Sequence, residues 1–158
     1  SFIAVLLSVV FITSCSTNSV IDVVNADLLD GEFAVASVTV NNSTGQAFDI
    51  DIESMLTKGL LDELGSQSIL DETGGKFNLD VSIVQYEKGN AFARWMVPGM
   101  GATVLSVEAS LKDSSGSIVA QSQATKSIGA GGGYTIGAWS TVFKDISKTL
   151  VADLVSIK

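Results

Sequence analysis

Apolar residues in this chain recur with two different periods, and this contrast restricts the fold more than any other feature. Apolar and polar residues alternate over residues 77–83 and again over 105–112, which is typical of strands with one buried face. Over residues 48–64 and 139–154 the apolar residues are three and four apart, as in amphipathic helices. A sheet with one apolar face is stable when helices cover that face.

Two further segments complete the predicted order of elements. Residues 32–40 are β-branched or small and lie between turn sequences, so they predict a strand. Residues 117–127 follow the turn Asp113-Ser114-Ser115-Gly116 and predict a hairpin with 105–112. The order is β-α-β-β-β-α. We predict an α+β fold in which one mostly antiparallel or mixed sheet carries both helices on one face.

The first 14 residues form an uncharged apolar run that ends in small residues before Cys15. The run is shorter than the ~20 residues that a spanning helix requires. It therefore predicts a signal peptide, whose basic beginning we expect to be missing from this sequence. A free or buried thiol in a secreted protein is the alternative for Cys15. An intramolecular disulfide is excluded because the chain has one cysteine.

The segment Ile12-Thr13-Ser14-Cys15 resembles the lipobox of bacterial lipoproteins. The resemblance implies diacylglycerol on Cys15, cleavage before it and acylation, as with palmitate, of the new amino group. Ser16 resembles the sorting residue of lipoproteins destined for the outer membrane. We therefore expect a signal peptide over 1–14, the lipidated Cys15 and a tether over 15–30, and one domain over 31–158, held on the periplasmic side of the outer membrane.

The chain is acidic, with a net charge of −8. Such a surface repels the phosphates of nucleic acids, so we expect no nucleic-acid partner. The expected attachments are the membrane, through the lipid anchor, and a protein of the cell envelope.

Residues 91–101 form an unusually apolar connection between two predicted strands. Aromatic residues, methionine and arginine are enriched where protein interfaces exclude water. One hypothesis is that this segment binds a partner or lies on a membrane; the alternative is that it folds back and completes the core. The candidate partner-binding residues are Phe92, Arg94, Trp95, Met96 and Met100.

A glycine cluster precedes the last predicted helix. The backbone N–H groups of Gly131, Gly132 and Gly133 could bind an anion near the helix N-terminus. The cluster lacks the Gly-Lys-Ser/Thr ending of a phosphate-binding loop and the spacing of a dinucleotide-binding turn. A flexible connector is the alternative that glycine equally favours.

The sequence contains no histidine, which removes the commonest general base and most transition-metal sites. Asp49, Asp51 and Glu53 could serve a glycosidase-like reaction or calcium binding, but acids at this position are also typical of a helix start. We therefore expect no catalytic residues, no metal site and no cofactor, and hence no enzyme.

The order of elements and three sequence stretches resemble an uncharacterised family of bacterial envelope lipoproteins built around one domain of unknown function. The stretches are residues 94–103, 111–116 and 131–133. In architecture that family is distantly similar to the lipoprotein domains of the curli secretion channel and of the activators of penicillin-binding proteins. The curli channel implies two long membrane-entering hairpins, whereas this chain offers only residues 86–103, too few for a pore.

These observations favour a membrane-anchored, non-enzymatic module that binds or assembles with a partner in the bacterial envelope. The first alternative is a periplasmic domain that binds a small ligand or anion through the glycine cluster. The second is a carboxylate-dependent hydrolase.

Overall fold

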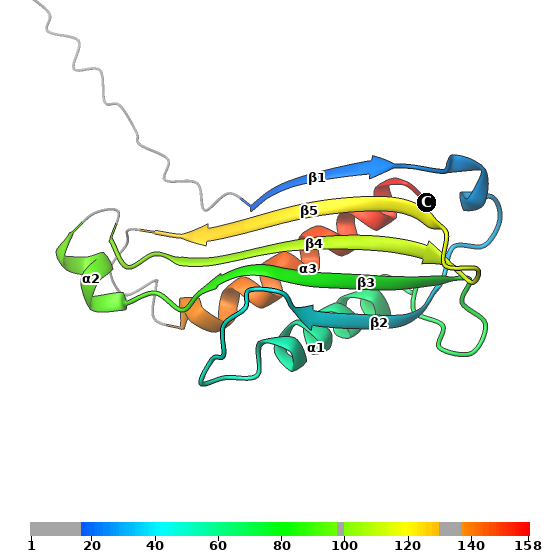
Figure 1. Ribbon diagram of the computed structural model, residues 1–158. Helices are drawn as coiled ribbons and strands as arrows, with labels where there is room; N and C mark the ends of the chain where they lie inside the picture. Colours follow the sequence, from blue (N-terminus) through cyan, green and yellow to red (C-terminus); the bar gives the residue numbers. More distant parts are fainter. Residues whose placement is uncertain (1–16, 98–99, 130–136) are drawn as a thin grey trace, which may run out of the picture.

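Five strands form one mixed sheet, and two long helices lie together on one of its faces (Figure 1). The computed structural model describes residues 17–97, 100–129 and 137–158. The elements in chain order are β1 (Thr17–Val23), the 3₁₀ helix η1 (Ala26–Leu29), β2 (Val35–Asn42), α1 (Ile52–Ser66), β3 (Phe77–Glu87), α2 (Ala91–Met96), β4 (Thr103–Asp113), β5 (Ile118–Ile128) and α3 (Ala138–Ser156).

The strand order across the sheet is β1-β5-β4-β3-β2. Strand β2 runs parallel to β3, and the other three neighbouring pairs are antiparallel. The predicted α+β class, the mixed sheet with both helices on one face and the order β-α-β-β-β-α are confirmed by β2, α1, β3, β4, β5 and α3. The structure adds β1 before this series and the short helix α2 within it.

The core lies between the sheet and the two long helices. Alternate residues of the central strands are buried, and the helices contribute a stripe of buried residues spaced three and four apart, as the two periods predict. Members of this core with at most 1% exposure include Leu56, Leu60, Leu64, Leu79, Val81, Ile83, Leu105, Val107, Leu111, Ile146 and Leu150.

Part of the segment 15–30 belongs to the sheet, so the prediction of a tether is wrong for Thr17–Val23. These residues form the edge strand β1, which pairs with β5 from Thr17 opposite Lys126 to Val23 opposite Ala120. Asp153 of α3 accepts hydrogen bonds from Ser19 at 3.1 Å and from Ser122 of β5 at 2.9 Å, so one carboxylate holds both strands. The polar composition of β1 lacks a full apolar stripe, and pairing with β5 stabilises it instead.

The face of the sheet opposite the helices carries mainly small, neutral polar side chains. Figure 1 shows that no helix covers this face. By the strand register, its residues include Ser37, Thr39, Asn41, Asn78, Ser82, Ser106, Ser110, Gln121, Gln123 and Thr125. Such a face needs no apolar cover, which explains why two helices on the other face suffice.

Across the described ranges 17–97, 100–129 and 137–158, no helix has the length and the apolar character needed to cross a membrane.

Candidate functional site

The apolar connection between β3 and β4 projects from one end of the sheet as a closed loop (Figure 1). The two strands pair as far as Glu87 opposite Val104. Beyond that pair, the Asn90 N–H donates to the Gly101 carbonyl at 2.9 Å, and Thr103 Oγ1 donates to the Lys88 carbonyl at 2.8 Å. These bonds hold the two ends of the loop together, so the segment between them has a fixed base.

Within the loop, residues 91–96 form helix α2 rather than the irregular connection expected from the sequence. The Asn90 side chain accepts hydrogen bonds from the N–H groups of Phe92 and Ala93 at 2.9 and 3.1 Å, which is N-terminal capping. At the other end Val97 is extended, with φ −136° and ψ 112°. It precedes Pro98 in the sequence, and a residue before proline disfavours the helical conformation.

The apolar side chains of this loop point into solvent. Phe92 is 68% exposed, Met96 56%, Val97 46% and Met100 56%. These four residues are called the apolar tip below. Their exposure shows that the alternative in which this segment completes the core is wrong for them. The side chains of the other two candidates, Arg94 and Trp95, lie outside the described part of the structure.

A group of aromatic residues lies behind the apolar tip and joins it to the body of the domain. Tyr86, at the end of β3, is buried, and its hydroxyl donates to the Trp139 carbonyl at 3.1 Å. Its ring contacts Phe48 and Phe143, with centroids 5.1 and 5.3 Å away. Burial, with the negative charge of Asp49 as the smaller cause, raises the pKa of Tyr86 to about 12.

Trp139, at the start of α3, is partly exposed. The sequence does not predict this exposure, because the spacing of Trp139 places it on the apolar face of the last helix. Trp139 is 37% exposed, and the Lys88 ammonium lies 5.6 Å from the centroid of its ring. Trp139 lies in the first turn of α3, directly after the glycine-rich segment, and this position at a helix start is the sequence feature that could have indicated its exposure.

The three carboxylates proposed for catalysis or calcium binding have structural partners. Asp49 accepts a hydrogen bond from Lys88 at 2.7 Å, and this bond together with the lysine charge lowers the pKa of Asp49. Asp51 caps α1 through the Ser54 N–H and hydroxyl, at 2.9 and 2.8 Å, which lowers its pKa. Glu53 accepts from the Asn42 N–H at 2.7 Å. No two of them face one another across a shared pocket, so the geometry gives the hydrolase alternative no support.

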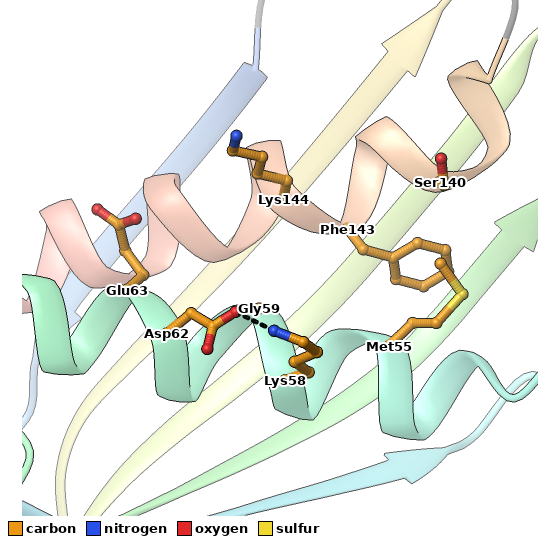
Figure 2. Close-up of a pocket in the computed structure, with 8 residues that line it drawn as sticks. All are labelled: Met55, Lys58, Gly59, Asp62, Glu63, Ser140, Phe143 and Lys144. Carbon is orange, nitrogen blue, oxygen red and sulfur yellow. Dashed lines mark hydrogen bonds and ion pairs between the residues drawn. The ribbon is translucent and has the colours of Figure 1, made fainter.

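A shallow groove runs along the outer side of the helix pair (Figure 2). Its volume is about 340 Å³, and the residues that line it come from α1 and α3: Met55, Lys58, Gly59, Asp62, Glu63, Ser140, Phe143 and Lys144. Lys58 and Asp62 form an exposed ion pair within one turn of α1. The groove therefore has an apolar floor with charged rims.

Two predicted sites lie outside the described residues, namely the lipidated Cys15 and the glycine cluster Gly131, Gly132 and Gly133. Among the residues that the structure does describe, no group of three carboxylate, thiol or imidazole side chains lies close enough to hold a metal ion.

Residues 36–132 match the family model DUF4410, which is described as a domain of unknown function. No curated protein matches the chain.

Solved structures with the same fold include two bacterial proteins. The PelC dodecamer from Paraburkholderia phytofirmans is similar with a TM-score of 0.59 and 15% identity, over 87% of this chain and 97% of that chain. A DUF330 protein from Xanthomonas campestris is similar with a TM-score of 0.56 and 12% identity, over 75% of this chain and 81% of that chain. At these identities the likeness establishes a shared fold.

Proposed function

Because the chain belongs to the DUF4410 family, whose domain has no known function, we propose a function from the geometry of the chain itself. We propose that it is a lipid-anchored module of the bacterial envelope that acts by attachment rather than catalysis, and that the apolar tip is its binding surface. In this proposal Cys15 carries the lipid, and the domain lies on the periplasmic side of the outer membrane.

The observation that carries this proposal is the exposure of the apolar tip on a capped helix. Scattered exposed valines are normal on a protein surface, but Phe92, Met96 and Met100 are large, adjacent and held in place by the closed base of the loop. Apolar side chains with this much exposed surface remain in contact with water in the isolated domain. The exposure of these side chains is explained if a binding partner covers the apolar tip when the protein is attached to it.

An assembly role is also supported by the fold. Within the described sheet, β1 and β2 each pair with a strand on one side only, which leaves an edge open to a neighbour along β1 and along the middle of β2; at the ends of β2 the backbones of Val35 and Asn42 already have partners. PelC, which has the same fold, forms a dodecamer, and this supports the proposal that such a domain can assemble with other subunits.

Site-specific photocrosslinking in living cells tests the proposed binding surface. A photoreactive amino acid at position 96 should give a discrete envelope adduct, protein or lipid, because this side chain is exposed at the tip. The matched control is position 114, an exposed turn position at the other end of the sheet. Equal labelling from both positions, or none from position 96, would contradict the proposal.

A small-ligand function is the second candidate, and the groove between α1 and α3 is the observation that favours it. Its volume of about 340 Å³ is within the range of ligand sites, although its charged rims are solvent-exposed. A ligand for this groove should raise the melting temperature of the parent protein but not that of a Met55→Asp variant, because Met55 lines the groove and is only partly buried.

A further inference from the structure

We propose that the apolar tip inserts into the surface of the same bilayer that holds the lipid on Cys15, so that the domain stands on the membrane at two points. This inference rests on the proposed function, because it names the partner of the binding surface identified there.

The strand register places the beginning of β1 at the same end of the sheet as the apolar tip. Thr17 lies opposite Lys126 of β5, and Lys126 lies opposite Leu105 near the start of β4. The loop that bears the tip joins β3 to this same start of β4. In Figure 1 helix α2 lies at one end of the molecule, and β1 starts toward that same end but farther in. A lipid close to the start of β1 therefore brings this end of the domain to the membrane.

The chain between the proposed lipid and the sheet is short. Cys15 precedes Thr17 by two positions, so its Cα reaches at most about 7 Å beyond the first residue of β1. Strand β4 begins at Thr103, two positions before Leu105, so it extends about 7 Å beyond the level of Thr17, and the loop that bears the tip lies farther out (Figure 1).

The tip therefore projects farther toward the membrane than Cys15 can. The apolar faces of interfacial helices enter a bilayer to a depth of roughly 5–10 Å, and a tip that lies beyond the level of Cys15 is placed to do the same. With Cys15 at the level of the headgroups, the side chains of the tip reach the beginning of the acyl region. A long tether would let the domain move away from the membrane. From Thr17 onward the chain is not a tether, because it is paired with β5.

The side chains at this end are those that favour a lipid interface. Among the described residues, the exposed large apolar side chains other than valine and isoleucine are Phe92, Met96, Met100 and Trp139, and all four lie at this end. Tryptophan is enriched at membrane interfaces, and the ion pair of Lys88 with Asp49 lies beside the ring of Trp139. Between Gly89 and Gly101 the sequence has no acidic residue and one basic residue, Arg94.

The loops at the opposite end of the sheet carry more acidic residues than the loops at the tip end, where residues 43–51 contain Asp49 and Asp51 and residues 88–102 contain Lys88 and Arg94. The loops 24–34, 70–76 and 113–117 meet at that opposite end, because Val35 pairs with Phe77 and Phe77 with Asp113. They contain one lysine, Lys76, and the acids Asp27, Asp30, Glu32, Asp71, Glu72 and Asp113. An acidic protein that rests on anionic headgroups is least repelled when its acids point away from the surface. This unequal distribution of acidic residues between the two ends favours a bilayer, rather than a protein, as the partner of the apolar tip.

Depth-sensitive fluorescence on the lipidated protein tests the insertion. The protein is purified from bacterial membranes with Met96→Cys or, as the matched control, Ser114→Cys, so that the introduced thiol is the reactive one once Cys15 is acylated. An environment-sensitive dye is attached, and the protein is reconstituted into vesicles of phosphatidylethanolamine with a minority of phosphatidylglycerol. We expect a blue-shifted emission and a several-fold smaller iodide quenching constant at position 96 than at position 114.

Two exposed positions provide a second comparison in the Met96→Cys background. Phe92→Asp, at the tip, should restore iodide quenching of the label, whereas Val20→Asp, on the open face of β1, should leave the label protected. Both side chains are exposed, so both variants should fold.

Different failures separate the two proposals. A protein that does not float with the vesicles would refute the lipid anchor and, with it, the insertion. A vesicle-bound protein whose label at position 96 is quenched as strongly as that at position 114 would refute the insertion alone. The insertion would also be overturned, with the binding surface retained, if photocrosslinking from position 96 in cells yielded a protein adduct instead of lipid.

Discussion

At the scale of single residues, Tyr86 joins the end of β3 to the start of α3. Its ring lies between Phe48 and Phe143, and its hydroxyl donates to the backbone of Trp139. Burial favours the neutral phenol, which explains why the pKa of Tyr86 is raised to about 12 from its ordinary value of about 10. The residue holds the two segments from which the apolar tip and Trp139 project.

This pKa shift predicts a loss of stability at alkaline pH. Because the pKa of Tyr86 is higher in the folded state, its contribution to the free energy of unfolding is complete below about pH 10. That contribution should decrease as the pH rises through the folded pKa of about 12. The measurement is urea unfolding against pH in a Tyr134→Phe background, where Tyr86 is the remaining tyrosine.

Tyr86→Phe is the control for this experiment, because it retains the ring and lacks the titrating hydroxyl. It should cost about 1 kcal/mol at neutral pH through the lost hydrogen bond. All other titratable groups are the same in both proteins, so the difference between them isolates Tyr86. An unchanged difference between pH 9 and about pH 12 would show that the phenol is not protected by folding.

At the scale of elements, the pair α1 and α3 depends on a close approach at Gly59. A Cβ at this position would lie 2.5 Å from Ser147 Oγ and 3.3 Å from Ser147 Cβ. Ser147 is buried, and its hydroxyl donates to the Phe143 carbonyl at 2.8 Å. Glycine weakens a helix on its own, so its presence in the middle of α1 is explained by this contact.

Two glycines in the same helix give opposite predictions. Gly59→Ala should lower the free energy of unfolding by about 1–2 kcal/mol, because overpacking outweighs the gain in helix propensity. Gly65→Ala should raise it by about 0.4–1 kcal/mol, because no atom lies within 4 Å of the added Cβ. Thermal and urea unfolding measure both.

Adding Ser147→Ala to Gly59→Ala tests the mechanism, since it removes the nearer of the two Ser147 atoms. It should recover part of the loss. A Gly59→Ala variant as stable as Gly65→Ala would mean that the helices separate freely and that the close approach contributes nothing.

At the scale of the whole molecule, β1 determines where the domain begins and how it is oriented. It covers one edge of β5 along seven paired positions and is joined to α3 through Ser19 and Asp153. With β1 in the sheet, the domain begins almost at Cys15, and the lipid and the apolar tip are held at one end.

Truncation tests this boundary. A chain that begins at Ser16 should fold with the stability of the parent domain, because it retains all of β1. A chain that begins at Ala26 should lose about 2–4 kcal/mol, since cross-strand pairs contribute roughly 0.2–1 kcal/mol each. Circular dichroism during thermal unfolding measures the difference. Equal melting temperatures would restore the prediction that residues 15–30 are only a tether.

The amino-acid sequence by itself determined the α+β class, the order of six elements and the buried faces, because hydrophobic period is a local property that the core then uses directly. It also singled out Phe92, Met96 and Met100 as residues that require a partner, either the core or something outside the chain. The match to a domain of unknown function over residues 36–132 agrees with the resemblance that the sequence motifs carried.

Only the tertiary structure decided between those two partners and assigned β1. Thr17–Val23 is a strand because β5 and Asp153 supply its hydrogen bonds, and such distant partners leave no periodic signal in a polar segment. Similarly, the solvent exposure of Met96 depends on the closed base at Asn90 and Gly101, and the shared position of the tip and the chain start depends on the register of four strands. These are long-range relations, which a local pattern does not contain.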